Sequence, residues 1–248
     1  MRKFIVGNWK MNGLASDLDE ISVIAACVSA YPSVDSAICV PSTLVHRAST
    51  SISGFAIGAQ DCHMQVTGAH TGCVSAQMLA DAGAVLTIVG HSERRAAQHE
   101  HDADIKGKAK AAKDAGLNVI VCVGETLQER DAGQALNIVL GQIERSLPDN
   151  SAGDWLSVAY EPVWALGTGR IPEEKDVAEM HDAVRAQLVG RFGEAGKGVR
   201  ILYGGSMNGD NASSLLAIPN VGGGLIGGAS LTAAKFEPIL AAAANLPE

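Results

Sequence analysis

The chain has 248 residues, of which 47% are apolar, and its formal net charge at pH 7 is −8. This apolar content is enough for a sizeable hydrophobic core and excludes a disordered chain. The negative charge makes nucleic acid and anionic membrane surfaces poor partners, because both are bound by clustered lysines and arginines.

We expect a cytoplasmic protein. No apolar run approaches the length of a secretory signal or a membrane span. The five cysteines are odd in number and scattered, with no CxxC pair, which argues against disulfides and structural zinc. The polar run HEHD (99–102) contains residue types that bind metals, but it is short and favours a solvated loop or first helical turn.

Eight apolar, β-rich runs follow one another along the chain and predict eight strands. They are KFIVGN (3–8), SAICVP (36–41), FAIGAQ (55–60), AVLTIVG (84–90), LNVIVCVG (117–124), LSVAYE (156–161), VRILYGG (199–205) and GGLIGG (223–228). Between them lie stretches with apolar residues at helical spacing, such as residues 17–30 and 173–192. Strands that alternate with helices imply parallel strands joined by crossovers.

Eight such units in a chain of this length favour a closed, eight-stranded parallel (β/α)8 barrel. The strand runs are continuously apolar, as expected of strands that are covered on both faces. An open doubly wound sheet is the alternative, but it requires a glycine-rich fingerprint after the first strand that GNWKMNG (7–13) does not match. Because no linker or shift in composition marks a boundary, residues 1–248 are predicted to form a single α/β domain.

The carboxyl ends of the strands open on one face of such a barrel, so polar residues placed there converge. These ends carry Asn8 and Lys10, His91, and Glu161. A lone lysine is usually a surface residue, and a lone histidine near a strand end usually only satisfies backbone groups. Glu161 is the stronger candidate, because an acid at the end of a core strand is costly to bury.

Glycine-rich turns follow the last two predicted strands, YGGS (203–206) and IGGAS (226–230). Either turn alone is explained by a tight corner. In a (β/α)8 barrel, however, phosphate sites are often found after the seventh and eighth strands. Backbone N–H groups at a helix N-terminus there favour an anion.

Five motifs together resemble the triosephosphate isomerase family. They are GNWKMNG (7–13), IVGHSERR (88–95), AYEPVWALGTG (159–169), ILYGGS (201–206) and IGGASL (226–231), in that family's order and spacing along essentially the whole chain. The resemblance implies a TIM barrel and an isomerase that interconverts dihydroxyacetone phosphate and D-glyceraldehyde 3-phosphate, in glycolysis and gluconeogenesis. It implies no metal and no organic cofactor.

The resemblance also implies a role for each motif residue. Glu161 is the expected base, neutral His91 and Lys10 are the electrophiles, and Asn8 is a further hydrogen-bonding group. Glu93 is expected to steady Lys10 or the substrate. A base and donors aimed at the developing oxyanion are what proton transfer next to a carbonyl requires. For this family the glutamate base and the neutral histidine are a standard example of pKa tuning.

Residues 162–172 resemble the family's mobile lid. An enediolate phosphate loses its phosphate in water, so the site must exclude solvent during turnover. The phosphate is expected to contact Gly167, Ser206, Gly227 and Gly228, with Lys10 as the only nearby full positive charge. The lid's exit, which is Arg170, Ile171 and Pro172, is two residues shorter than in the family.

The resemblance further implies a homodimer in which the loop 61–75 reaches a neighbouring subunit, with Thr71 at the partner's site. Asp61 stands where the family has an asparagine, His70 where it has an aromatic residue, and Cys73 where it has a glutamate. That glutamate pairs across the interface with an arginine, which is Arg94 here, so we expect a weaker dimer.

Two other functions are possible for this barrel. A Schiff-base aldolase needs a lysine nucleophile within a late strand, and the last three strand runs contain none. A protein that only binds sugar phosphates needs neither the base nor the imidazole. The sequence therefore favours the isomerase.

Overall fold

A computed structural model describes residues 1–149, 153–165 and 172–246. In this part of the chain, eight parallel strands pair in chain order and close into a barrel, because β8 pairs with β1. The strands are β1 (Phe4–Asn8), β2 (Asp35–Cys39), β3 (Ala56–Ala59), β4 (Leu86–Val89), β5 (Asn118–Val123), β6 (Leu156–Tyr160), β7 (Arg200–Tyr203) and β8 (Gly223–Ile226). The predicted closed (β/α)8 barrel is confirmed.

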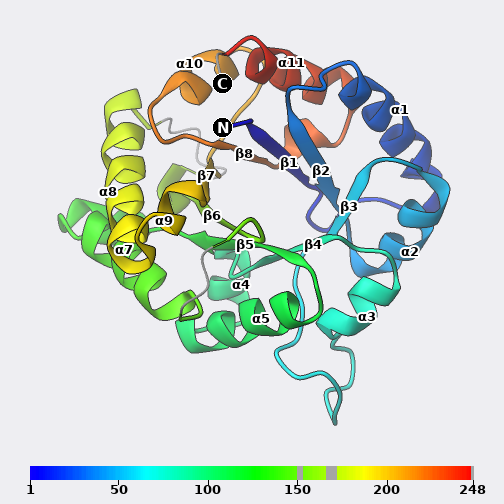
Figure 1. Cartoon of the computed structure of the whole chain (residues 1–248), viewed down its shortest axis with the longest axis horizontal. Coiled ribbons are helices and arrows are strands. Elements are labelled where there is room, and N and C mark those ends of the chain that lie inside the picture. Colours follow the sequence, from blue (N-terminus) through cyan, green and yellow to red (C-terminus); the bar gives the residue numbers. More distant parts are fainter. Residues whose placement is uncertain (150–152, 166–171, 247–248) are drawn as a thin grey trace.

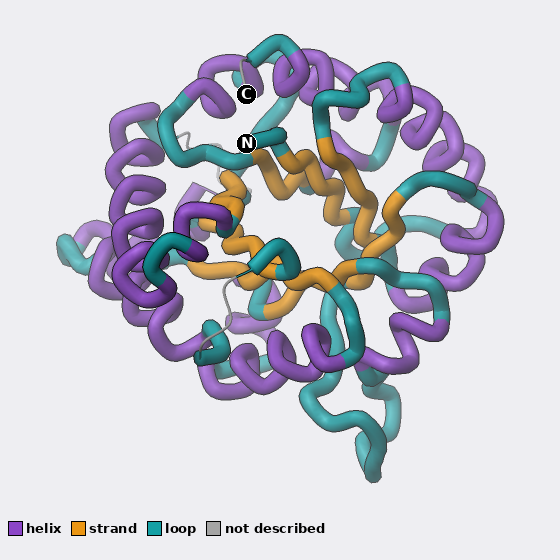
Figure 2. Tube along the Cα trace, viewed as in Figure 1, coloured by secondary structure: helices purple, strands orange, loops and turns teal. Residues whose placement is uncertain are grey.

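Helices surround the barrel as an outer ring (Figures 1 and 2). They are α1 (Leu18–Ser29), α2 (Ser42–Ser51), α3 (Ala76–Asp81), α4 (Ser92–Ala97), α5 (Asp102–Asp114), α6 (Leu127–Asp131), α7 (Ala135–Ser146), α8 (Glu174–Phe192), α9 (Ala195–Gly198), α10 (Ala212–Ala217) and α11 (Ala233–Ala244). Short 3₁₀ turns form η1 (Ala15–Asp17), η2 (Val163–Ala165) and η3 (Gly228–Ser230). None of the helices in the described ranges is long and apolar enough to cross a membrane.

Alternate residues of each strand belong to two separate cores. In β5, Ile120 and Cys122 belong to the small cluster formed by strand residues alone. Val119, Val121 and Val123 belong to the larger cluster that includes the helices. Successive side chains point to opposite faces of a strand, so a strand that is buried on both faces must be apolar at every position. This explains why the strand runs in the sequence are continuous.

The run HEHD (99–102) leads into α5, which begins at Asp102. The expected first helical turn is therefore confirmed at Asp102, but the two acids of the run are not solvated as expected. Glu100 lies 2.6 Å from Lys108 Nζ, and Asp102 lies 2.6 Å from Arg95 Nη1. Both carboxylates are largely buried, and these ion pairs offset the cost of removing them from water.

His181 on α8 is fully buried and is packed edge-on against Tyr160 of β6. Its Nδ1 lies 3.3 Å from the carbonyl oxygen of Asn220, while its Nε2 has no hydrogen-bond partner in the described residues. Burial lowers the pKa of His181 to about 4. The folded state therefore favours the neutral imidazole.

We predict an acid-sensitive contribution of His181 to stability. The unfolded chain binds this proton near pH 6.5, so the contribution is complete above that pH and is lost as the pH falls toward 4, at about 1.4 kcal/mol per pH unit. In urea unfolding at pH 7.5, 6 and 5, the free energy of unfolding of His181→Gln should fall less steeply than that of the wild type. Equal slopes would contradict the prediction.

Candidate active site

The end of β1 brings Asn8 and Lys10 to the mouth of the barrel. Trp9, between them, is buried, and its indole N–H donates to the carbonyl oxygen of Ser230, 2.9 Å away. Lys10 has a left-handed backbone with φ of 53°, which is unusual for a residue with a side chain. Its N–H donates to Asn8 Oδ1 at 3.0 Å, and this bond holds the turn.

His91 is the N-cap residue of α4, directly beyond β4. Its Nδ1 accepts a hydrogen bond from the backbone N–H of Glu93 at 3.3 Å, while the Glu93 carboxylate lies farther away, at 3.7 Å. A ring nitrogen that accepts from an amide carries no proton, so a neutral ring in this arrangement carries its proton on Nε2. That Nε2 lies 2.7 Å from Glu161 Oε1.

Glu161 follows β6 directly, and its side chain is almost fully buried. Its Oε2 accepts from the backbone N–H of Ser92 at 2.8 Å, and its Oε1 lies 2.7 Å from His91 Nε2. The amide donor and the adjacent imidazole thus compensate a carboxylate that has left water. Burial and then the charge of Glu161 raise the pKa of the Cys122 thiol, which therefore stays protonated beside the carboxylate.

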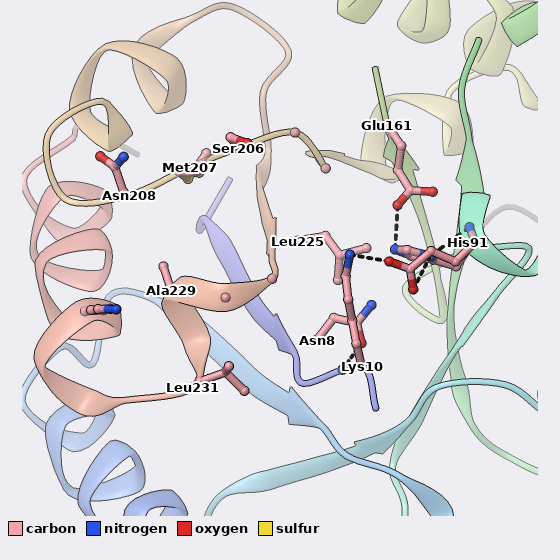
Figure 3. A pocket seen from close by; sticks show the side chains of 16 residues that line it. Asn8, Lys10, His91, Glu161, Ser206, Met207, Asn208, Leu225, Ala229 and Leu231 are labelled. Carbon is pink, nitrogen blue, oxygen red and sulfur yellow. Dashed lines mark hydrogen bonds and ion pairs between the residues drawn. The ribbon is translucent and has the colours of Figure 1, made fainter. Parts of the chain in front are cut away.

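These side chains line one cavity of about 800 Å³ at the carboxyl ends of the strands. Figure 3 shows Glu161 and His91 pointing toward each other on one side, with Asn8 and Lys10 beside them. Lys10 Nζ lies 2.6 Å from Glu93 Oε1, so the expected contact of Glu93 with Lys10 is present. A base candidate, an N–H donor and an ammonium face the same space.

The two glycine-rich turns form the other side of this cavity. Ser206, Gly227 and Gly228 line it, and Figure 3 places Ser206 across from Glu161 and His91. Gly227 is the N-cap residue of η3. It lies close to the lysine, since an ideal Cβ at Gly227 would be 3.7 Å from Lys10 Cε.

The first part of the predicted lid is well anchored. Residues Val163–Ala165 form η2, and the indole N–H of Trp164 donates to Glu125 Oε1 at 2.8 Å. The Arg130 guanidinium lies 4.6 Å from the centre of the Trp164 ring. Gly167, Arg170 and Ile171 lie outside the described residues.

Sequence reasoning missed several side chains at this site. The cavity is also lined by Met207, Asn208, Leu231 and Lys235, so the expectation that Lys10 is the only nearby full positive charge is wrong. Lys235 lies in the first turn of the helix that follows IGGASL. Its position after the last strand, at the open end of the barrel, was the feature of the sequence that indicated a place near the site. Glu125, which follows β5, was missed in the same way.

Arg94 has ion-pair partners within the same chain. Its Nη2 lies 2.9 Å from Asp61 Oδ2 and 2.7 Å from Glu100 Oε1. Lys108 contacts the same two acids, at 2.8 Å and 2.6 Å. Cys73 cannot pair with Arg94 as a glutamate at that position would. Asp61, at the base of the loop 61–75, supplies Arg94 with a carboxylate instead.

A closed parallel barrel whose titratable side chains gather at the carboxyl ends of its strands defines a TIM-barrel enzyme. Residues 3–243 match the family model described as triosephosphate isomerase. The chain is 53% identical to the triosephosphate isomerase of Ruegeria pomeroyi, over 97% of both chains. It is 54% identical to that of Caulobacter vibrioides, over 97% of this chain and 96% of the relative.

Among solved structures, the crystal structure of triosephosphate isomerase from Bartonella henselae is similar, with a TM-score of 0.92 and 44% identity. The similarity covers 98% of this chain and 99% of that one. The chain belongs to the triosephosphate isomerase family, and it is an enzyme.

Gly124, directly beyond β5, is predicted to be sensitive to substitution. An ideal Cβ at Gly124 would lie 1.9 Å from the carbonyl oxygen of Glu161, so Gly124→Ala must displace the Glu161 backbone. A displacement of about 1 Å at a reacting group costs about 10²-fold in rate, and we expect a loss in kcat of that order.

Gly190→Ala is the matched control, since Gly190 lies within α8 and a Cβ there meets nothing within 4 Å. This variant should gain about 0.5–1 kcal/mol of stability and keep its activity. Circular dichroism checks that both variants fold. A folded Gly124→Ala variant with normal kcat would show that the Glu161 backbone tolerates the shift.

Proposed function

We propose that the enzyme interconverts dihydroxyacetone phosphate and D-glyceraldehyde 3-phosphate through an enediolate, with Glu161 as the base and neutral His91 and Lys10 as electrophiles. The 2.7 Å contact between His91 Nε2 and Glu161 Oε1 carries this proposal. It puts a carboxylate and an N–H donor within reach of neighbouring atoms of one small ligand. Membership of the family supports the same reaction.

The proposed steps leave the composition of the substrate unchanged. The Glu161 carboxylate takes a proton from the hydroxymethyl carbon, the C–H electrons form the C=C bond, and the carbonyl oxygen becomes an oxyanion. His91 Nε2–H and the Lys10 ammonium donate to the two enediolate oxygens. After a proton passes between those oxygens, Glu161 returns its proton to the neighbouring carbon and an aldehyde forms. Donors aimed at the developing charge lower the barrier.

In the resting arrangement, Glu161 accepts from the N–H of Ser92 and lies 2.7 Å from His91 Nε2. The proton on His91 Nε2 cannot serve Glu161 and a substrate oxygen with full strength at once. Substrate that takes over this donor therefore frees the carboxylate to abstract a proton.

The neutral state of His91 is important for this mechanism. An imidazolium beside Glu161 would hand the base a proton before the substrate does. The N–H of Glu93 occupies Nδ1, so Nε2 is the ring nitrogen that faces Glu161. Neutral imidazole as electrophile is the role described for this family.

We propose that Ser206, Gly227 and Gly228 bind the phosphate with neutral donors, and that Gly167 completes the ring when residues 162–172 close as a lid. The bond from Trp164 to Glu125 anchors the entry of this lid to the end of β5. Asn8 and Glu93 hold Lys10, through its N–H and its Nζ respectively. No metal or organic cofactor takes part in the proposed reaction.

We also propose that residues 1–248 form one domain that works as a homodimer in the cytoplasm. The loop 61–75 projects from the body of the barrel in Figure 1, which supports a role in contacting a second copy. The aldolase alternative is not favoured, because β6, β7 and β8 contain no lysine.

Glu161→Gln should lower kcat by about 10²–10⁴-fold, because an amide cannot accept the proton. Binding of 2-phosphoglycolate, an unreactive anionic probe, should survive. Glu194→Gln is the control, since this side chain is 87% exposed and follows α8, away from the cavity. Near-normal turnover in Glu161→Gln would remove Glu161 from the role of base.

Thr71→Asp should dissociate the proposed dimer and lower kcat, because a charge at this position would be buried against the partner. Sedimentation velocity at micromolar protein, together with activity at the same concentration, measures both effects. A wild type that is a fully active monomer would contradict the proposed assembly.

A further inference from the structure

The charged side chains of the cavity are unevenly placed. Those that line it within the described residues are Lys10, Glu93, Glu161 and Lys235. The first three lie close together around His91, where Glu93 already neutralises Lys10 at 2.6 Å. This side of the cavity therefore carries one uncompensated negative charge, on Glu161.

A phosphorylated triose approaches this cavity against the field of the protein. The chain has a net charge of −8, and the reacting end of the site adds the charge of Glu161. A dianion is repelled by both. A cation at the other end of the cavity would reduce this repulsion and also decide which end of the ligand enters on which side.

Lys235 is placed for this role. It is an exposed residue in the first turn of α11, and it makes no ion pair or side-chain hydrogen bond with any described residue. A cation near a helix N-terminus is unfavourable by about 0.3–1 kcal/mol, because the helix dipole is positive there. The nearby Glu20 carboxylate is directed to the backbone, since it accepts from the N–H of Ala233 at 2.6 Å. Local structure therefore gives no reason for a lysine at this position.

The surroundings of Lys235 suit an anion. The cavity wall that precedes α11 consists of Gly227, Gly228 and Leu231, and Asn208 lies on the same side, across from His91 (Figure 3). Asn208 Oδ1 accepts from the N–H groups of Asp210 and Asn211, at 2.9 Å and 3.3 Å. The side-chain oxygen of Asn208 is thus occupied by backbone N–H groups. The side-chain NH₂ is the group that remains available to an anion.

We propose that Lys235 steers the substrate: its ammonium attracts the phosphate to the wall formed by Ser206 and Gly228, so that the carbon end arrives at Glu161. This inference rests on the proposed triose phosphate substrate. Lys235 acts on the encounter and on the orientation of the ligand, while the proton transfers belong to Glu161 and His91. Such an effect changes kcat/KM and is screened by salt.

The test compares Lys235→Gln with Lys197→Gln. Both substitutions remove one positive charge, but Lys197 lies just before β7, at the opposite end of the barrel from the cavity. At an ionic strength of about 10 mM, where the screening length is about 30 Å, Lys235→Gln should lower kcat/KM for D-glyceraldehyde 3-phosphate about 3–10-fold with kcat unchanged. The loss should nearly vanish at 1 M salt. Lys235→Arg should retain the wild-type values, and Lys235→Glu should lose more.

Binding of inorganic phosphate, measured by calorimetry at both ionic strengths, tests the same charge without turnover. Lys235→Gln should weaken it at low salt, and Lys197→Gln should not. The inference is overturned if the two variants are indistinguishable in phosphate binding, or if the loss in Lys235→Gln is independent of salt or falls on kcat. A wild type that binds phosphate through Lys235 but does not isomerise the triose phosphate would instead overturn the proposed function alone.

Discussion

The 2.7 Å contact between His91 Nε2 and Glu161 Oε1 is the one on which the site depends. It joins the ends of β4 and β6, which lie on either side of β5, and so it depends on the order of these three strands in the sheet. Each partner is held by a backbone amide as well, Glu161 by Ser92 and His91 by Glu93. The turn at the start of α4 thus sets both the position of the Glu161 carboxylate and which nitrogen of the imidazole faces it.

Two arginines secure that short helix to the barrel. Arg94 reaches Asp61 beyond β3, and Arg95 donates to the carbonyl oxygens of Gly90 and Cys122 at 3.0 Å each. A six-residue helix has little stability of its own, because helix nucleation is costly. Arg94 and Arg95 hold α4 against the ends of three consecutive strands, β3, β4 and β5. Precision at His91 is therefore a property of the barrel rim rather than of α4 alone.

The two sides of the cavity carry different charges. The reacting side combines Glu161 with a lysine that Glu93 already neutralises, whereas the wall near α11 carries Lys235 and neutral donors. A strongly basic pocket would hold a dianionic product as tightly as the substrate, which lowers KM without raising kcat. The steering role that we propose for Lys235, as a single exposed cation, would speed the encounter at less cost to release.

The sequence by itself determined the eight strands and the barrel, because continuous apolar runs that alternate with helical periods have few other ways to bury their surface. It also located Asn8, Lys10, His91 and Glu161, since strand ends must converge in a parallel barrel. Only the tertiary structure decided that Lys235 lines the same cavity and that Arg94 pairs with Asp61 and Glu100. Those facts depend on side chains from elements distant in the chain, and neither helical spacing nor strand alternation encodes which of them meet.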